Sequence, residues 1–243
     1  MIRIAVGYKD LMNLYGDYAN VAALTRYLRE NGFLVETDHF SSASYVNLES
    51  IDLLYIGAGT ERRMLIALED FRRYFNELRR FVDRGGFILA TGSALALFGN
   101  TIVDYNGVLR SAAGLLDTDV TLIKKRSYSD LILKAAFCEQ PIVGSINSSS
   151  VIITRGQPMF TVEKESLRKN RVTEGCCNRT VFATELSGPL FIRNPSLLHY
   201  FAERVSDKKL PESAEAWINS AREGHKRVLE NLRRELRGNI WQR

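Results

Sequence analysis

The residues best suited to chemistry lie at the end of a predicted buried strand, in the stretch RGGFILATGSALALFGN at residues 84–100. The run GFILATG predicts a strand, and the residues after it predict a helix, so Thr91, Gly92 and Ser93 form the turn between them. Many enzymes of this size carry a nucleophile at such a turn. This turn offers the hydroxyl groups of Thr91 and Ser93, but no cysteine.

A second candidate loop, GAGTERR at residues 57–63, follows the apolar run IDLLYIGAG. Functional loops of open α/β sheets lie at the carboxyl ends of the strands, so we expect the two loops to face each other across a cleft. Either loop alone is also typical of an ordinary strand-to-helix turn, because glycine tolerates tight backbone angles. Spacing alone therefore leaves both readings open.

The elements that must position these loops alternate between strand and helix through the first hundred residues. Residues 2–8 and the runs FLVETDHF and IDLLYIGAG predict strands, and residues 17–31 and 65–82 predict helices. Asp17 is a plausible N-cap of the first helix. This alternation predicts an α/β fold with a doubly wound, mostly parallel sheet flanked by helices.

The pattern changes after about residue 120. Short strands separated by turn-forming residues are expected there, as later strands and hairpins of the same α/β domain. NPSLLHYFAERV predicts a helix, and a last long helix is expected at about 212–237. Its apolar stripe consists of Ala214, Trp217, Ile218, Ala221, Val228, Leu229, Leu232 and Leu236. The predicted organisation is an α/β domain at 1–205, followed by a linker and amphipathic helix at 206–243.

Composition narrows the function classes. With 45% hydrophobic and 25% charged residues, the chain is expected to be globular. The net charge of +5 comes from arginines interleaved with acids, so we expect no nucleic-acid binding. No signal peptide or membrane span is predicted, which favours a cytoplasmic location.

Cysteine and histidine are scarce. Of the three cysteines, Cys176 and Cys177 are adjacent, and no second Cys/His pair stands at metal-ligand spacing. We therefore expect no metal site. The three histidines, His39, His199 and His225, limit any mechanism that needs a histidine base.

Four separated blocks carry a family resemblance: LMNLYGDYAN at 11–20, LLYIGAGTERR at 53–63, GSINSSS at 144–150 and ELSGPLFIRNP at 185–195. In order and spacing they resemble the class I glutamine amidotransferases of the cobyric acid synthase type. The similarity is greatest to the glutaminase subunit of lipid II isoglutaminyl synthase, which works with a Mur-ligase-like partner. The resemblance spans roughly residues 1–205 and implies the fold already expected.

The resemblance also implies where the catalytic residues of the family would stand. The nucleophilic cysteine corresponds to Gly92, and the histidine before Gly-Pro corresponds to Ser187. The elbow glutamine has become Ala96, and the Gly-Gly-Gly-Gln-Asp type oxyanion loop has become residues 57–61. Glutamine hydrolysis needs a thiolate and a base. No catalytic residue is therefore expected to be intact, with Ser93 or Thr91 as the possible displaced nucleophile.

Two other positions, Arg126 and Asn147, match the family pattern more closely. By resemblance, Arg126 contacts substrate or partner, and Asn147 matches the asparagine of a family block. The plain alternatives are a surface charge and a turn residue. The expected ligand-binding set is Gly57, Ala58, Gly59, Ser93, Arg126 and Asn147, with no cofactor.

Three functions remain open from the sequence. The first is a non-catalytic scaffold or regulator with a Mur-ligase-like, ATP-dependent partner in cell-wall precursor amidation. The second is an active amidotransferase or hydrolase with a displaced nucleophile, and the third is an amino-acid-binding sensor. The stripe of the last helix is expected to dock on its own domain, on a second copy of the chain in a homo-oligomer, or on a partner.

Overall fold

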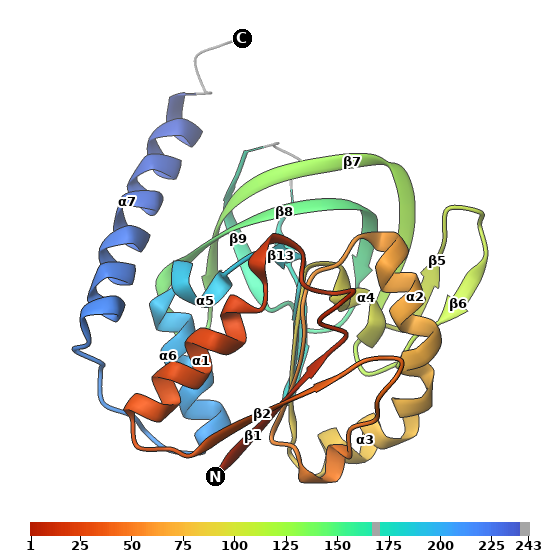
Figure 1. Ribbon diagram of the computed structural model, residues 1–243. Coiled ribbons are helices and arrows are strands. Elements are labelled where there is room, and N and C mark those ends of the chain that lie inside the picture. The colour runs from red at the N-terminus through yellow and green to blue at the C-terminus, as the bar shows by residue number, and fades with distance from the viewer. Residues whose placement is uncertain (167–170, 239–243) are drawn as a thin grey trace.

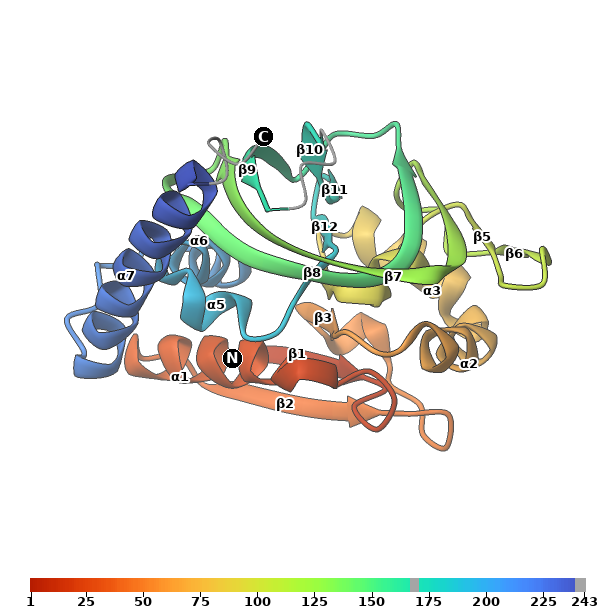
Figure 2. The same cartoon turned by 90° about the horizontal axis from the view of Figure 1, so that it is seen from above.

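A computed structural model describes residues 1–166 and 171–238 of the 243-residue chain. Figure 1 shows a sheet flanked by helices, with two long strands arching over one end of it and a long helix at one side. Figure 2, the view from above, shows these two strands running across the helices and strands beneath them.

The first sheet has six strands in the order β11-β12-β4-β3-β1-β2. All neighbouring pairs are parallel except β11 with β12. The central strands consist almost wholly of buried apolar residues, as expected for a sheet covered on both faces. The bounds are β1 (Ile2–Gly7), β2 (Val35–Phe40), β3 (Leu53–Ile56), β4 (Phe87–Thr91), β11 (Cys176–Asn178) and β12 (Val181–Thr184).

Helices cover both faces of this sheet. On one face, α2 (Glu61–Phe71), α3 (Phe75–Asp83) and α4 (Leu95–Phe98) contribute to a core that includes Phe71 and Phe98. On the other face, α1 (Ala19–Glu30), α5 (Leu190–Arg193) and α6 (Pro195–Ser206) contribute to a second core with Leu24 and Phe201. The predicted doubly wound α/β fold is therefore confirmed.

The middle of the chain forms a second sheet that is mostly antiparallel. Its strands are β5 (Thr101–Val103), β6 (Leu109–Ser111), β7 (Thr118–Ala135), β8 (Cys138–Thr154), β9 (Phe160–Glu165), β10 (Thr173–Glu174) and β13 (Leu186–Ser187).

The expectation of short strands was wrong for β7 and β8, which have 18 and 17 residues. The polar stretch KKRSYS lies within β7, inside the run VTLIKKRSYSDLILKAAF for which a strand was expected. The register with β8 shifts between Leu122 and Ser127, so the extra residues bulge and the strand continues.

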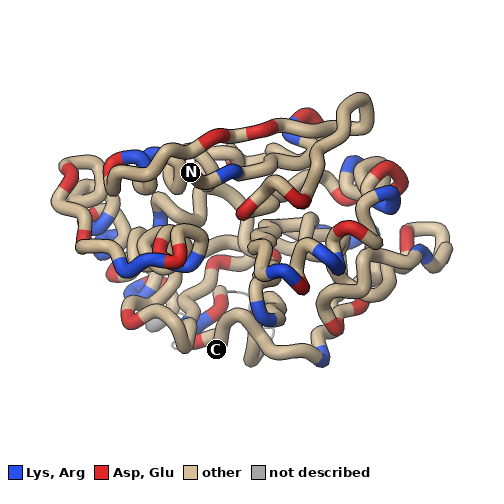
Figure 3. The backbone as a smooth tube through the Cα atoms, turned by 90° about the horizontal axis from the view of Figure 1, so that it is seen from below, with Lys and Arg blue, Asp and Glu red and all other residues tan. Residues whose placement is uncertain are grey.

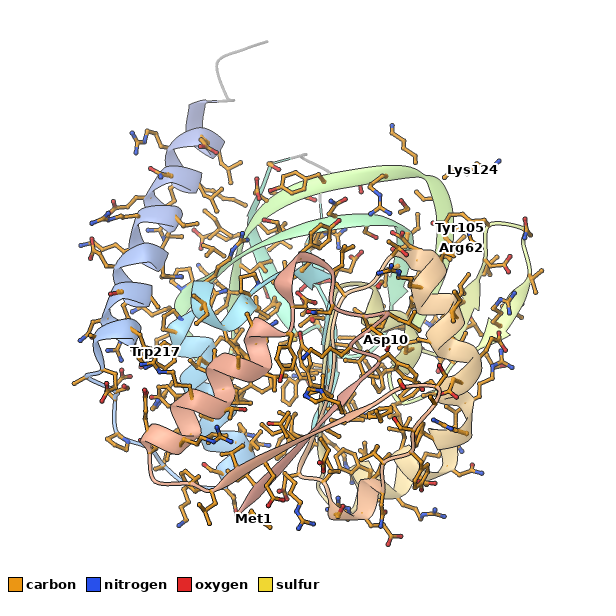
Figure 4. All side chains as sticks on the ribbon, in the orientation of Figure 1. Met1, Asp10, Arg62, Tyr105, Lys124 and Trp217 are labelled. Atoms are coloured by element: carbon orange, nitrogen blue, oxygen red, sulfur yellow. The ribbon has the colours of Figure 1, made fainter. Side chains whose placement is uncertain are left out.

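The last helix, α7 (Ala216–Gly238), packs on its own chain. Ile218 is buried in the core beside α6, and Leu229 packs with Ile132 of β7 and Val143 of β8. Trp217, labelled in Figure 4 near the start of α7, donates a hydrogen bond to Glu30 of α1 at 2.8 Å, and the Arg26 guanidinium lies over its ring. The stripe is covered in part within one chain: Ile218 and Leu229 are buried, whereas Val228 is 41% exposed and Ala214 precedes the helix. These contacts give no support to the expected homo-oligomer.

Basic and acidic positions are interspersed along the backbone, as Figure 3 shows from below. Several of them pair within one helix, such as Arg26 with Glu30 and Arg227 with Glu223. Within the described residues, no helix combines the length and apolar character needed to cross a membrane.

Candidate functional site

The turn after β4 has the backbone shape of a nucleophile elbow. β4 ends at Thr91, and a single helical turn at Gly92–Ala94 leads directly into α4. Gly92 has a φ of 59°, in the left-handed region. Enzymes hold their nucleophile in such a strained turn, whereas glycine adopts it without steric cost. The elbow geometry is kept, but the residue at its tip has no side chain.

Ser187 lies beside this tip, as expected if the two positions correspond to the family's catalytic pair. A Cβ built on Gly92 would be 3.0 Å from the Ser187 Oγ. Ser187 stands in β13, which pairs with β8 in the second sheet, whereas Gly92 follows a strand of the first sheet. The two positions are 95 residues apart in the sequence and are brought together only by the packing of the two sheets.

Ala58 occupies the space that a side chain at position 92 would need. The same ideal Cβ on Gly92 would be 2.5 Å from the Ala58 Cβ and 3.1 Å from its Cα. Carbon atoms that are not bonded prefer about 3.5–4.0 Å. No side chain fits on Gly92 while Ala58 keeps this position. The loop at 57–59 therefore fills the space where the family resemblance expects the side chain of the nucleophile.

The Ser93 hydroxyl is fully engaged in holding this loop. Its Oγ accepts a hydrogen bond from the Gly59 N–H at 3.0 Å and donates one to the Gly59 carbonyl at 2.8 Å. A serine nucleophile needs a base that takes its proton. Here the proton is directed to a backbone carbonyl, so Ser93 acts as a clamp between the elbow and the loop.

The backbone N–H groups of the loop are also taken. The Ala58 N–H donates to the Asp17 carboxylate at 2.5 Å, and the Gly59 N–H donates to Ser93. An oxyanion hole needs donors aimed at a position where charge develops. These two donors are satisfied inside the protein, so the loop offers neither of them to a ligand.

Asp17 is the residue that joins the loops of the site. Its Oδ2 accepts hydrogen bonds from the Ala58 N–H and from the Thr91 hydroxyl at 2.7 Å, and its Oδ1 accepts one from the Gly188 N–H. The side chain is fully buried, and burial raises the pKa of this carboxyl to about 6 despite the three donors. The prediction of Asp17 as a helix N-cap was wrong, because α1 begins at Ala19 after Tyr18.

Asn20 and Tyr55 support the same hub. The Tyr55 hydroxyl donates to the Asp17 carbonyl at 2.9 Å, accepts from the Asn20 amide at 3.0 Å, and lies 2.9 Å from the Thr91 Oγ1. The Asn20 amide also donates to the Gly188 carbonyl at 3.2 Å. Burial raises the pKa of Tyr55 well above its ordinary value, so this hydroxyl stays protonated and cannot serve as a base.

Arg126 and Asn147 lie together, at the edge of the site nearest α2. Arg126 forms a 2.6 Å ion pair with Glu61, whose carboxylate also accepts the Ser149 N–H at 2.7 Å. Asn147 accepts a hydrogen bond from Arg126 at 3.3 Å and donates one to the Tyr15 hydroxyl at 2.9 Å. Glu61, which stands in the altered oxyanion loop, therefore neutralises the arginine expected to contact a substrate.

A second ion pair lies beside the site. Glu185, which lines the cavity near Ser187, pairs with Arg171 at 2.5 Å. The neighbouring Glu174 is buried, and burial together with the charge of Glu185 raises the Glu174 pKa to about 7. Glu174 accepts hydrogen bonds from the Thr184 hydroxyl and the Glu185 N–H, so this carboxylate serves to fix the chain before Ser187.

The cavity left between these groups is small. Its volume is about 20 Å³, enough for roughly one water molecule. Most of the expected ligand-binding residues line this cavity: Ala58, Gly59, Ser93 and Asn147. Gly92 and Ser187 line it as well. The other two expected residues, Gly57 and Arg126, do not line it. None of the three histidines lines it either. A glutamine side chain does not fit in this space.

The sequence pointed to the elbow and to Ser187, but it missed the hub and the closing ion pair at Glu61. Asp17 and Asn20 belong to the block LMNLYGDYAN, which carried part of the family resemblance. The sequence did not show that their side chains join the loops of the site. Among the described residues, no group of three His, Cys, Asp or Glu side chains could hold a metal ion.

With the fold and the site in place, comparison with known proteins gives the class. The sequence profile of the CobB/CobQ-like glutamine amidotransferase domain matches residues 3–195, and the chain belongs to this family. All four blocks that carried the family resemblance, at 11–20, 53–63, 144–150 and 185–195, lie within the matched residues.

Two curated relatives are subunits of one kind of enzyme. The chain is 22% identical to the GatD subunit of the glutamine-hydrolysing lipid II isoglutaminyl synthase of Staphylococcus aureus (strain N315), over 90% of this chain and 91% of the relative. It is 21% identical to the GatD subunit from Streptococcus pneumoniae (strain ATCC BAA-255 / R6), over 86% and 82%. A solved glutamine amidotransferase of Thermotoga maritima has the same fold, with a TM-score of 0.53 at 12% identity, covering 98% of this chain and 97% of that one.

Proposed function

We propose that this chain is a non-catalytic glutamine amidotransferase-like subunit that acts as a scaffold or regulator. The observation that carries the proposal is Gly92 at the family's nucleophile position, with its side-chain space filled by Ala58. A thiolate and its base act as a unit, and here glycine and serine stand at the two positions. The proposal therefore rests on two observations: Ala58 fills the space beside Gly92, and neither Gly92 nor Ser187 offers a thiol or an imidazole.

The partner that we propose is a Mur-ligase-like, ATP-dependent enzyme in cell-wall precursor amidation. Support comes from the two relatives, which are subunits of lipid II isoglutaminyl synthase and align with most of this chain. In this proposal residues 1–205 are the amidotransferase-like domain, and residues 206–243 are a linker and helix added to it.

Two other functions are weakened by particular contacts. A displaced nucleophile at Ser93 would need to lose both of its hydrogen bonds to Gly59 and to find a base. An amino-acid sensor would need a cavity larger than the water-sized space beside Gly92, and an arginine that Glu61 does not already hold. We therefore rank both below the scaffold.

The direct test is release of glutamate from glutamine by the purified full-length chain, alone and with a co-expressed Mur-ligase-like protein from the same genome. We expect no release above buffer in either sample. Removing a nucleophile or base that acts as part of a unit typically costs a factor on the order of 10⁶ in turnover. Turnover that Ser93→Ala abolishes and Thr91→Ala leaves unchanged would replace this proposal with a serine active site.

Association with the partner is tested separately. We expect the co-expressed pair to elute from a sizing column as one complex, whether or not glutamine is present. If the chain binds no Mur-ligase-like protein and also lacks glutaminase activity, the non-catalytic reading stands but the proposed partner does not.

A further inference from the structure

A basic face lies beside the closed site, where the first turn of α2 meets the bulge of β7. The 2.6 Å ion pair between Glu61 and Arg126 joins these two segments. The face consists of the exposed cations next to this pair in the chain, none of which forms a salt bridge with a described residue: Arg62, Arg63, Lys124 and Lys125. Figure 4 shows Arg62 and Lys124 at the same edge of the molecule.

Nearby acidic groups do not cancel these charges. Glu61 is held by Arg126, and Glu69, further along α2, is paired with Arg110. Asp104 pairs with Arg110 as well. The cations of the basic face are therefore a local excess of positive charge, although the chain as a whole carries only +5. Charge concentrated in this way speeds the association of an oppositely charged surface.

Exposed tyrosine side chains border the basic face and are held in place. The exposed fractions are 45% for Tyr15, 40% for Tyr105 and 53% for Tyr128. Tyr15 is bonded to Asn147, and the Tyr128 hydroxyl donates to Asp130 at 2.7 Å. Partial burial raises the pKa of Tyr105, and the carboxylate of Glu61 raises it further, so this hydroxyl lies beside the ion pair at the face. Tyrosine and arginine are enriched among the residues that carry most of the binding energy of protein interfaces.

Aliphatic side chains beside Tyr105 distinguish a protein partner from a nucleic acid. The turn between β5 and β6 exposes Val108 and Leu109 by 48% and 66%. Asp104 holds this turn, because its carboxylate accepts the N–H groups of Asn106 and Val108. Figure 1 shows the β5–β6 hairpin projecting from the body of the domain. A single-stranded nucleic acid binds through its phosphates and stacked bases, whereas apolar groups fill the core of a protein interface.

We propose that the basic face and the β5–β6 turn bind the acidic surface of a protein partner. The cations meet carboxylates of the partner, and Tyr105, Val108 and Leu109 pack against apolar groups beside them. Charges at the rim of an interface set the association rate and its salt dependence, and a well-packed aromatic anchor sets the affinity. This docking rests on the proposed function in one respect, that the chain works with a protein partner, and it adds where that partner binds and which charge it presents.

The test measures binding of the full-length chain to the purified Mur-ligase-like protein by surface plasmon resonance at several NaCl concentrations. We expect the association rate to fall as the salt concentration rises. Lys124→Glu combined with Lys125→Glu should lower the association rate by about tenfold or more at about 50 mM NaCl. The matched control is Lys208→Glu with Lys209→Glu, a second exposed lysine pair that follows α6, which changes the net charge equally. It should change the rate by less than about twofold.

A tyrosine pair tests the apolar part of the surface. Tyr105→Ala should weaken binding by about tenfold, mainly through faster dissociation, because an anchor residue acts on the formed complex. Tyr45→Ala is the control, since Tyr45 is 58% exposed and stacks on Tyr74, beyond the other end of α2. Equal effects of the two tyrosine variants would overturn the placement of the partner on the β5–β6 turn.

The lysine pairs decide whether the basic face binds an acidic surface. Equal effects of the two pairs on binding of the Mur-ligase-like protein would overturn the proposal. Where that protein does not bind the wild type at all, the proposed partner is wrong, and a polyglutamate peptide decides the proposal instead. We then expect saturable polyglutamate binding that the Lys124 and Lys125 reversal abolishes and the Lys208 and Lys209 reversal leaves intact. No such contrast, or tighter binding of an oligothymidylate of equal charge, would overturn it.

Discussion

The Cβ of Ala58 lies 2.5 Å from the position that a Cβ on Gly92 would occupy. The two residues come from different strand ends, at β3 and β4, and they meet because these strands are parallel neighbours. By the family resemblance, a glycine is expected at position 58 and a cysteine at position 92.

This contact predicts the cost of any side chain at position 92. Gly92→Ala should lower the free energy of unfolding by more than Gly107→Ala, although both glycines have a positive φ. Nothing lies within 4 Å of a Cβ on Gly107, so that variant reports backbone strain alone. We expect the difference to be about 1–3 kcal/mol, the usual range for overpacking, measured by urea unfolding.

The matching double variant tests the cause. Adding Ala58→Gly to Gly92→Ala should recover most of the difference between Gly92→Ala and Gly107→Ala, because the two effects belong to residues in contact and are not additive. Equal losses for the two glycine variants would show that the loop at 57–59 moves away without cost.

The same geometry predicts what restoring the catalytic pair requires. The double variant Gly92→Cys with Ser187→His should remain inactive as a glutaminase, because Ala58 still fills the space beside the new thiol. The triple variant with Ala58→Gly should release more glutamate than the double, although the Ala58-position and Gly59 N–H groups stay engaged by Asp17 and Ser93. Triple and double variants with the same rate would contradict this account.

Asp17 predicts a pH dependence of stability. Its folded pKa of about 6 is above the unfolded value of 3.8, so the folded state holds the proton more tightly. Stability from this group is therefore present below about pH 4 and is lost as the pH rises through about 6. The loss is of the order of 3 kcal/mol, since one pKa unit corresponds to about 1.4 kcal/mol.

The measurement compares unfolding free energies from pH 4 to 8. Asp17→Asn should flatten the profile between about pH 4 and 6 relative to the wild type, whereas Asp38→Asn, at an exposed position of β2, should not. Glu174, with a pKa near 7, contributes in the same direction at slightly higher pH, so Glu174→Gln separates the two groups. Parallel profiles for the wild type and Asp17→Asn would contradict the role of Asp17 in the hub.

The docking of α7 predicts a contrast between two neighbouring faces of the helix. Ile218→Ala should lower the free energy of unfolding by about 2–5 kcal/mol, because the side chain is 1% exposed in the core. Val228→Ala should change it by less than about 0.5 kcal/mol, because that side chain is 41% exposed. Chemical denaturation measures the free energy of unfolding of both variants, and size-exclusion chromatography checks that each stays monodisperse. Similar small changes for Ile218→Ala and Val228→Ala would mean that α7 does not unfold together with the rest of the domain.

The sequence by itself determined the α/β class, and it led to the expectation that Gly92 and Ser187 stand where the family resemblance implies a cysteine and a histidine. Buried strands such as FILAT read as continuous apolar runs, and a missing side chain at Gly92 is visible in the sequence without any structure. The expectation of short strands failed at β7 and β8, because two long strands that are bent by a bulge show no simple alternating pattern along their whole length.

Only the tertiary structure decided how the site is closed. Asp17 joins Ala58, Thr91 and Gly188 across separations of 41, 74 and 171 residues, and no local pattern encodes contacts of that range. The pairing of Arg126 with Glu61 likewise joins α2 to the bulge of β7. Whether a side chain is a ligand contact or an internal bond depends on what lies beside it in space, and that is set by the packing of the two sheets.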